Sequence, residues 1–361
     1  MKKIIFLVFV TFCWVSFVVG QIPAGYYDAA NGKTGVQLQA ALHDIIKGHT
    51  ITTYTPGVWA AYYTTDKKPD GTVWDMYSDI PDGTPNGHPP YVYTLGTDQC
   101  GTSSKEGDCY SREHSFPKSW FGGEVYPMYT DIFHLYPTDQ YVNGMRSDNP
   151  YGEVTSATWT AENGSKVGPC STTGYSGTVF EPLDAYKGDL ARTYFYMATR
   201  YYKEDTLWPG SDMVTGSQMK AWALTMMLRW SNGDPVSSKE TTRNEAIYQI
   251  QHNRNPFIDH PEYANLIWGN PNGIKEAGTL ILMVYPNPVQ NECFIRFPEG
   301  MSSANSSIAI YTITGQQLIP VISFGDEKIS LNLQGLAKGV YYLQLINTEN
   351  AGIFHAKLMK E

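Results

Sequence analysis

The chain has few charged side chains and no excess of basic ones. Of its 361 residues only 17% are charged, and 35 acidic residues outnumber 26 lysines and arginines, which gives a formal net charge of −9. Because 42% of the residues are hydrophobic, the composition excludes a disordered chain and allows a sizeable core. The missing basic excess argues at first against a polyanionic partner such as nucleic acid.

Several enzyme signatures are also missing. The chain contains no His-Glu-x-x-His and no Cys-x-x-Cys pattern, which speaks against a zinc protease. It contains no Gly-x-Ser-x-Gly sequence, the nucleophile turn of many serine hydrolases. Internal repeats and low-complexity tracts are absent as well.

Long apolar runs are limited to the N-terminus. Lys2 and Lys3 precede a run from Ile4 to Val19, a pattern typical of a signal peptide over residues 1–20 with cleavage before Gln21. The alternative is a membrane anchor, which the shortness of the run disfavours. Without the two lysines, 24 basic and 35 acidic residues remain, a formal charge of −11. We expect an exported, soluble protein without a stable membrane span.

Cysteines are few, and Cys13 leaves with the signal peptide. An oxidising destination permits disulfides between those that remain. Cys100 and Cys109 form the best pair, because they close a short loop, a closure worth roughly 2–3 kcal/mol. Cys170 and Cys293 fall in different predicted domains, so either is a candidate free thiol.

Length and turn signals divide the mature chain into two domains, at roughly 150 residues per domain as a prior. The spacing of apolar residues predicts helices near 34–46, 182–206, 218–230 and 238–253, with Thr34 and Ser237 or Ser238 as caps. Residues 269–273 form a Gly-, Asn- and Pro-rich linker signal. Beyond it, alternating segments with turns every 8 to 15 residues predict an all-β sandwich over 280–361.

Reactive side chains are densest between Cys109 and Glu153. His114 is a candidate general base, and Glu113 offers hard oxygens suited to Mg²⁺ or Ca²⁺. Neighbours in a regular strand point to opposite faces, so these two cannot share one face of a strand. Thr138 is a possible helix cap, which would place Asn143 about one turn into a short helix. A carboxylate and an amide oxygen would form a sparse metal site with room for water and a phosphate.

Other interpretations of these residues, without a catalytic role, stay open. Glu113 and His114 are also compatible with a solvated pair. Asp131 and His134 are compatible with a loop hydrogen bond or with part of a zinc site. Spacing alone does not decide between these interpretations and metal-dependent hydrolysis.

Three segments carry a specific resemblance, namely residues 112–117, 131–139 and 142–153, supported by further matches within 180–261. They resemble the endonuclease I family, secreted or periplasmic nucleases with a ββα-metal finger, over roughly 25–270. The resemblance implies an α+β catalytic domain over 21–272 with several helices. It also implies non-sequence-specific hydrolysis of DNA, and of RNA in many members, to 5′-phosphate ends.

The resemblance also implies roles for individual residues. His114 would be the general base, and Glu113 and Asn143 would bind one Mg²⁺, or another divalent ion such as Mn²⁺ or Ca²⁺, directly or through water. The family uses an arginine at the scissile phosphate, for which Arg146 is the first candidate and Arg112 the second, unless either is structural. Supporting roles fall to Asp131 and His134, which would orient the metal water or the finger, and to Asn149, which would hold the loop after the helix.

A helix face offers a candidate contact for the substrate backbone. Arg192 and Lys203 are 11 residues apart, close to three helical turns, and therefore share a face. Arg200 lies to one side, and Lys187 precedes them. The alternative is a solvated helix face. Because residues 22–275 contain 19 basic and 28 acidic residues, we expect weak, salt-sensitive and ion-dependent binding by a monomer.

The tail carries a second resemblance through residues 284–288, 311–316, 336–343 and 357–360. These segments resemble the type A sorting domain of the type IX secretion system of Bacteroidetes, although that family does not require Cys293. The resemblance implies export across the outer membrane by the type IX machinery, to the medium or the cell surface. The alternative functions are a surface-binding or structural protein with an inert nuclease-like scaffold, and a phosphodiesterase acting on smaller substrates.

Overall fold

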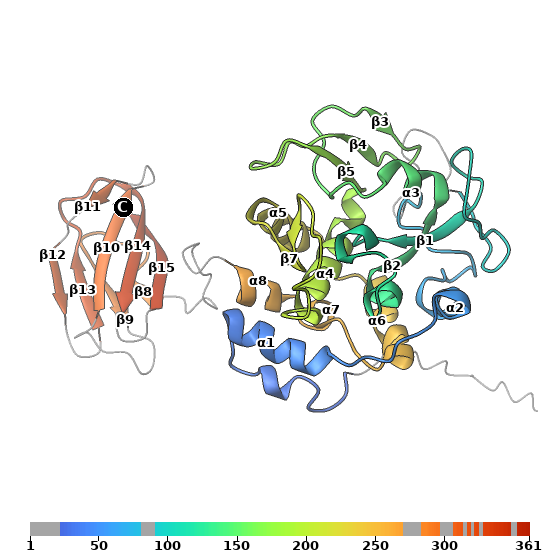
Figure 1. The fold of residues 1–361 in the computed structure, drawn as a ribbon. Helices are drawn as coiled ribbons and strands as arrows, with labels where there is room; N and C mark the ends of the chain where they lie inside the picture. The colour runs from blue at the N-terminus through green and yellow to red at the C-terminus, as the bar shows by residue number, and fades with distance from the viewer. Residues whose placement is uncertain are drawn as a thin grey trace, which may run out of the picture. The chain divides into compact units, whose positions relative to one another are not determined.

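The computed structural model describes most of the chain and separates it into two compact units. The described residues up to Gly269 form the first unit, and those from Met283 onward form the second (Figure 1). The expected signal peptide, residues 1–20, lies outside the described residues, as does the expected linker from Asn270 onward. The described ranges are 22–80, 91–269, 283–296, 306–312, 316–318, 321–324, 328–347 and 352–361.

Helices dominate the first unit, and four of them follow the predicted spacing. The long helices are α1 (Gly35–Ile46), α4 (Asp184–Arg200), α5 (Ala221–Gly233) and α6 (Ser238–Gln251). Helix α5 begins later than predicted, because Gln218 and Met219 form the short strand β7. Shorter helices are α2 (Trp59–Thr65), α3 (Gln140–Arg146), α7 (Pro256–Asp259) and α8 (Glu262–Trp268).

The helix caps were predicted with mixed success. The Ser237 hydroxyl accepts from the Glu240 amide, and the Glu240 carboxylate accepts from the Ser237 amide, which confirms the predicted start of α6. Thr34 precedes α1 but its side chain accepts no capping bond. The proposed cap Thr138 is wrong, since it lies within β2 and the Asp139 side chain caps α3 instead.

Helix α4 runs through the middle of the first unit (Figure 1). Fourteen of its 17 residues are buried, among them Tyr194, Phe195 and Tyr196. Helices α1, α5 and α7 pack against it. Burial on nearly all sides explains why this helix has no broad solvent face.

Strands β1 (Tyr110–His114) and β2 (Leu135–Asp139) form an antiparallel pair. In their register Glu113 lies opposite Tyr136, and His114 lies opposite Leu135. Helix α3 follows β2 without a break and contacts both strands. The order strand, strand, helix thus brings the residues around Glu113 next to those of α3.

The other strands of the first unit are short. Strands β3 (Trp159–Thr160), β4 (Lys166–Pro169) and β5 (Thr178–Glu181) form one antiparallel sheet, and β6 (Val214–Thr215) pairs with β7 (Gln218–Met219). Helices combined with separate small antiparallel sheets make an α+β structure, as predicted.

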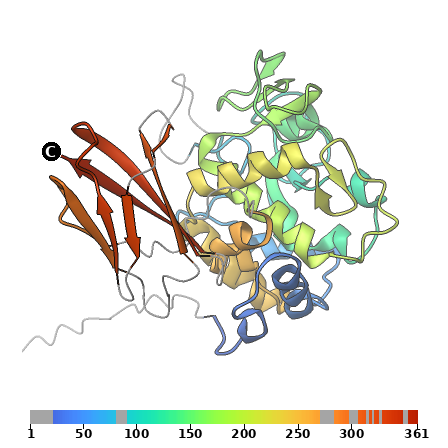
Figure 2. The same ribbon diagram turned by 90° about the vertical axis from the view of Figure 1, so that its left-hand side faces the viewer.

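The described part of the second unit contains two four-stranded antiparallel sheets, visible in Figure 2. One has the order β11-β10-β14-β15 and the other β12-β13-β9-β8. A single buried cluster includes Ile310 and Leu343 of the first sheet and Cys293 and Leu331 of the second. The strand bounds are Met283–Tyr285, Glu292–Arg296, Ser306–Thr312, Gln317–Leu318, Val321–Phe324, Lys328–Asn332, Gly339–Asn347 and Gly352–Lys360 for β8 to β15. Across the described residues of both units, no helix has the length and apolar character needed to span a membrane.

Candidate functional site

The two faces of β1 have different partners. Alternation in a strand sends Ser111 and Glu113 to one side and Arg112 and His114 to the other. Ser111 and Glu113 face α3, where they meet Asn143 and Arg146. Arg112 and His114 face a group of tyrosines, described below. The predicted separation of Glu113 from His114 is confirmed by these contacts.

Glu113 is buried, with 4% of its surface exposed. Its Oε1 accepts hydrogen bonds from the Tyr77 hydroxyl at 2.6 Å and from Arg146 Nη1 at 2.7 Å. Burial raises the pKa of Glu113 above the usual carboxyl range, and the Arg146 charge opposes that shift. No pattern in the sequence pointed to Tyr77, which lies 36 residues upstream of Glu113.

Arg146 connects α3 to β1 and is fully buried, with 0% exposure. Besides its ion pair with Glu113, it donates to the His114 carbonyl at 3.1 Å and to the Ser115 carbonyl at 2.9 Å. The guanidinium of Arg146 faces protein groups and not solvent, which supports the structural role that the sequence left open for this residue. Arg146 positions Glu113 and the end of β1.

Asn143 lies in the middle of α3, and its amide nitrogen donates to Ser111 Oγ at 3.2 Å. The start of α3 is fixed by Asp139, whose Oδ1 accepts from the amides of Tyr141 and Val142 at 2.7 and 2.9 Å. Its Oδ2 accepts from the Tyr93 hydroxyl and the Gly107 amide. Both carboxylate oxygens of Asp139 therefore serve to hold α3 in place.

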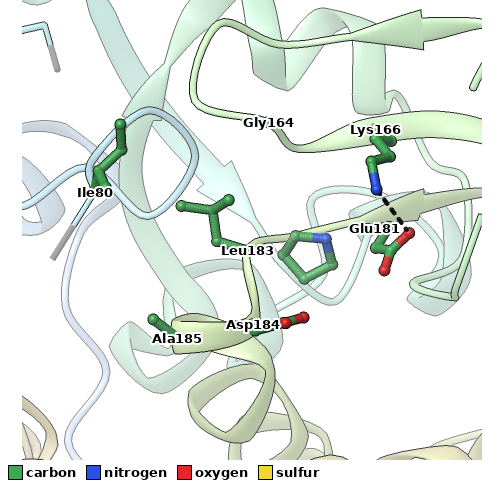
Figure 3. Close-up of a pocket in the computed structure, with 8 residues that line it drawn as sticks. Ile80, Gly164, Lys166, Glu181, Leu183, Asp184 and Ala185 are labelled. Atoms are coloured by element: carbon green, nitrogen blue, oxygen red, sulfur yellow. Dashed lines mark ion pairs between the residues drawn. The ribbon is translucent and has the colours of Figure 1, made fainter. Parts of the chain in front are cut away.

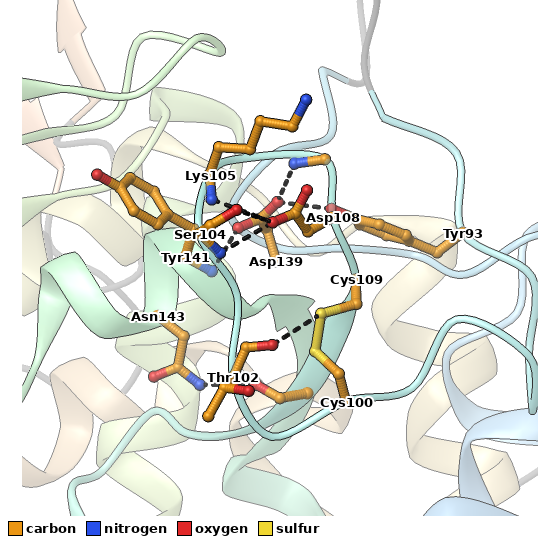
Figure 4. The surroundings of a disulfide bond; sticks show 12 residues. Tyr93, Cys100, Thr102, Ser104, Lys105, Asp108, Cys109, Asp139, Tyr141 and Asn143 are labelled. Carbon is orange, nitrogen blue, oxygen red and sulfur yellow. Dashed lines mark hydrogen bonds between the residues drawn. A yellow bond between two sulfur atoms is a disulfide. The ribbon is translucent and has the colours of Figure 1, made fainter.

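The predicted disulfide between Cys100 and Cys109 is present, and Figure 4 shows it beside Asp139 and Asn143. Cys109 immediately precedes β1, and its carbonyl accepts from the amide of Gln140, the first residue of α3, at 3.0 Å. The disulfide thus ties down the point where β1 and α3 meet. Cys170 and Cys293 are free and buried.

His114 is held in one tautomer by its surroundings. Its Nε2 lies 3.0 Å from the Tyr129 carbonyl oxygen. A carbonyl can only accept, so Nε2 carries the proton and the lone pair is on Nδ1. Burial holds the pKa of His114 well below its usual range, and the charges of His134, Lys118 and Arg112 act in the same direction. The ring is therefore neutral at neutral pH, with a nitrogen able to accept a proton.

An aromatic group that we call the His114 stack surrounds this ring. Tyr129 lies parallel to His114 with centroids 5.3 Å apart, and Tyr54 lies 4.3 Å from Tyr129. The guanidinium of Arg112 covers Tyr54 at 3.5 Å and donates to Thr55 Oγ1 at 2.8 Å. Arg112 is only half-buried, unlike Arg146. The residues Tyr54 and Tyr129 were missed from the sequence, where only their proximity to the histidine segments could have pointed to them.

The three predicted supporting residues have separate partners, and His134 is the one with a ring contact to His114. Asp131 accepts from Tyr196, Tyr201 and Gln251, and so ties its loop to α4 and α6. His134 pairs through Nε2 with the Met128 carbonyl at 2.7 Å and lies 5.4 Å from the His114 ring. Asn149 donates to the Arg146 carbonyl at the end of α3. Over the ranges that the structure describes, no three His, Cys, Asp or Glu residues gather into a possible metal site.

The predicted basic stripe is wrong for its two arginines. Arg192 is 0% exposed and binds both carboxylate oxygens of Glu240, and Arg200 is 3% exposed and donates to His49 and Glu204. They share a helix, but that helix is the core helix α4, where both guanidinium groups are buried and paired within the protein. Lys203 lies just past α4, against the Tyr202 ring.

Lys187 is also paired, with Glu181 at 2.9 Å and Asp184 at 2.6 Å. Figure 3 shows these two acids lining a cavity of about 300 Å³ together with Lys166 and Leu183. None of the residues lining it belongs to β1 or α3. The cavity is therefore separate from the site around Glu113 and His114.

Comparison with known proteins gives two family matches. The model of the Endonuclease I family matches residues 34–262, and that of the secretion system C-terminal sorting domain matches residues 283–361. An extracellular ribonuclease of Bacillus amyloliquefaciens is 39% identical over 253 residues, which cover 67% of this chain and 78% of the relative. An extracellular ribonuclease of Bacillus subtilis is 36% identical over the same shares, and an endonuclease-1 of Buchnera aphidicola is 28% identical over 130 residues, 36% of this chain and 46% of the relative.

Proposed function

Because this chain belongs to the endonuclease I family, and is a secreted or cell-surface nuclease with a type IX sorting tail, we propose that it is a metal-dependent, non-sequence-specific endonuclease. It hydrolyses phosphodiester bonds of DNA and RNA and leaves 5′-phosphate ends. The main support is the neutral imidazole of His114, whose Nδ1 carries a lone pair because Nε2 donates to the Tyr129 carbonyl. His114 directly follows Glu113, whose carboxylate is held by Arg146. The names of the Bacillus relatives support RNA as one substrate.

His114 acts as the general base. Its Nδ1 takes a proton from the attacking water, while the bond from Nε2 to the Tyr129 carbonyl fixes the ring and stabilises the positive charge that forms on it. The low pKa keeps the base unprotonated before the reaction. Stacking on Tyr129 limits rotation of the ring.

Glu113 and Asn143 fit the expected divalent ion. Both offer oxygen donors on the β1–α3 contact, and a site with two protein ligands leaves positions for water and phosphate, as Mg²⁺ prefers. Arg146 favours the charged form of Glu113, and Ser111 holds the nitrogen side of the Asn143 amide. When bound, the ion stabilises charge on the phosphate and on the leaving oxygen. We assign β1, β2 and α3 as the ββα-metal finger, and the second unit as a β-sandwich.

Arg112 is the arginine that we place at the substrate phosphate. It shares a face of β1 with His114, and its guanidinium is held flat by Tyr54 and by Trp59 at 4.3 Å. A planar donor of fixed orientation suits a phosphate group. Asp131, His134 and Asn149 position these residues and do not contact the substrate.

The test is cleavage of plasmid DNA and of RNA by the full chain with Mg²⁺ or with a chelator. We expect cleavage with Mg²⁺ and none with chelator, and a loss of roughly 10²–10⁴-fold in His114→Ala, the usual contribution of a general base. The matched control is His252→Asn, because His252 is exposed and its φ of 63° suits asparagine. An active His114→Ala protein would overturn the assignment of the base. Cleavage of a small phosphodiester at the rate of polymer would favour the smaller-substrate alternative.

A further inference from the structure

A second cation lies close to the His114 stack. Lys118 begins the short 3₁₀ helix η4 (Lys118–Phe121), four residues after His114. Its Nζ lies 5.6 Å from the centre of the Tyr129 ring, the ring that stacks on His114. The side chain is 49% exposed, and among the described residues it pairs with the exposed Glu124 at 3.5 Å. An exposed ion pair of this length holds the lysine only weakly, so an incoming phosphate can replace the carboxylate.

An exposed aromatic side chain continues this surface. Tyr126 is 49% exposed, and its ring meets that of Tyr129 edge to face at 5.7 Å. Its neighbour Val125 is 42% exposed. Tyr126 therefore presents an exposed aromatic face next to Tyr129, the ring that stacks on His114.

The charges elsewhere strengthen the case for this surface. The arginines Arg146, Arg192 and Arg200 are buried and paired with acids. The unit has an acidic excess, so a polyanion must be held by a few local cations. Arg112 and Lys118 are the cations that border the His114 stack.

We propose that Arg112, Lys118 and Tyr126 form a binding surface for one strand of nucleic acid. Adjacent phosphates of that strand contact Arg112 and Lys118, and an unpaired base stacks on Tyr126. This inference rests on the proposed function. A base within a duplex has both faces covered by its neighbours, whereas a base of a single strand can turn onto an aromatic side chain. The surface therefore selects single-stranded segments of DNA or RNA over duplex.

Binding can be measured without cleavage in the full chain carrying His114→Ala. The probes are a fluorescent single-stranded DNA 12-mer and a duplex of the same length, titrated at several NaCl concentrations. Adding Lys118→Ala should weaken binding and lower the magnitude of the slope of log K against log [NaCl] by about 0.7, the value for one phosphate contact of a single strand. Adding Tyr126→Ala should weaken single-strand binding roughly tenfold with the slope unchanged, and leave duplex binding unchanged.

Matched controls separate this surface from general effects. Lys33→Ala removes another exposed lysine, and Tyr285→Ala removes a tyrosine of similar exposure, 45%, in the second unit. Neither should change binding or slope. Lys118→Arg and Tyr126→Phe should bind the single strand like the parent, because the first keeps the positive charge and the second keeps the aromatic face.

The outcomes separate the inference from the proposed function. If the unaltered chain shows no metal-dependent cleavage, the proposed endonuclease function is wrong. If that chain cleaves but the Lys118→Ala and Tyr126→Ala proteins bind like their parent, the binding surface lies elsewhere. If Tyr126→Ala weakens single-strand and duplex binding equally, the preference for an unpaired base is wrong.

Discussion

The two faces of β1 differ in how their charges are held. On the α3 face, Glu113 is buried and neutralised by Arg146, and the helix that supplies Asn143 is anchored by Asp139 and by the disulfide loop. On the opposite face, His114 is neutral, and Arg112 and Lys118 retain partial exposure beside stacked tyrosines. We infer that the first face is built for fixed geometry and the second for access by a substrate.

The largest expected effect comes from removing the ion pair between Arg146 and Glu113 on the α3 face of β1. Arg146→Met leaves Glu113 buried without its counter-charge, and such a change typically costs about 3–5 kcal/mol. Urea denaturation should show that loss, with cleavage lost as well. The double variant Arg146→Met with Glu113→Gln should recover part of the stability and none of the activity. Equal stability of the single variant and the parent would mean that the ion pair does not fix this face.

Removing the Cys100–Cys109 disulfide should also weaken the α3 face of β1. Cys100→Ser with Cys109→Ser should lower the free energy of unfolding by roughly 2–3 kcal/mol. Because Cys109 precedes β1 and bonds to the start of α3, metal affinity should fall more than oligonucleotide affinity. Calorimetric titration with Mn²⁺ and the single-strand binding assay give the two values. A loss confined to oligonucleotide binding would contradict the link between the disulfide and α3.

These contrasts show what the sequence could and could not predict. The family resemblance predicted roles for Glu113, His114 and Asn143, and strand alternation predicted that Glu113 and His114 point to opposite faces of β1. The short loop predicted the Cys100–Cys109 disulfide, which the structure contains. Arg192 was misjudged, because spacing tells which residues share a helix face but not whether that face is buried. Arg146 was ranked above Arg112 on the family resemblance, which does not show which of the two arginines is buried. Buried acids such as Glu240, 48 residues away from Arg192, decide where an arginine goes. Lys118 and Tyr126 escaped notice because their value depends on the tertiary position of Tyr129.

A smaller effect is expected from changing Arg112 on the His114 face of β1. Arg112→Lys keeps the charge but loses the flat stacking on Tyr54, so we expect cleavage to fall roughly tenfold to a hundredfold, about 1.4–2.8 kcal/mol in the transition state. Unfolding should change by under about 1 kcal/mol, as for most half-exposed sites. Initial rates and thermal melts of the same samples provide the comparison. A stability loss as large as that of Arg146→Met would show that Arg112 is structural.

The smallest effect concerns pH. The folded-state pKa of His114 lies well below its value in the unfolded chain, so the folded form resists protonation. Its contribution to stability is present above the unfolded pKa of about 6.5 and is lost as pH falls below it. His114→Gln should therefore lose less stability than the parent between pH 7.5 and 5.5, by at most about 1.4 kcal/mol per pH unit.

Only the difference between variant and parent is informative in that experiment. Asp75 and Glu240 have pKa values raised to about 7, and raised acids contribute with the opposite sign, stabilising the fold as pH falls. The variant retains both acids, so their contribution cancels. Identical pH slopes for the two proteins would mean that His114 is not buried as a neutral ring.

The central claim is that one face of β1 binds the metal ion and the other supplies the general base. The most direct test is titration of the His114→Ala protein with Mn²⁺. We expect this protein to bind Mn²⁺ with the same affinity as the parent protein, although cleavage is lost, because the Glu113 and Asn143 face is untouched. Glu113→Gln in the same assay should lose the ion. Loss of Mn²⁺ binding in a folded His114→Ala protein would place His114 among the metal ligands and would overturn the separate roles of the two faces.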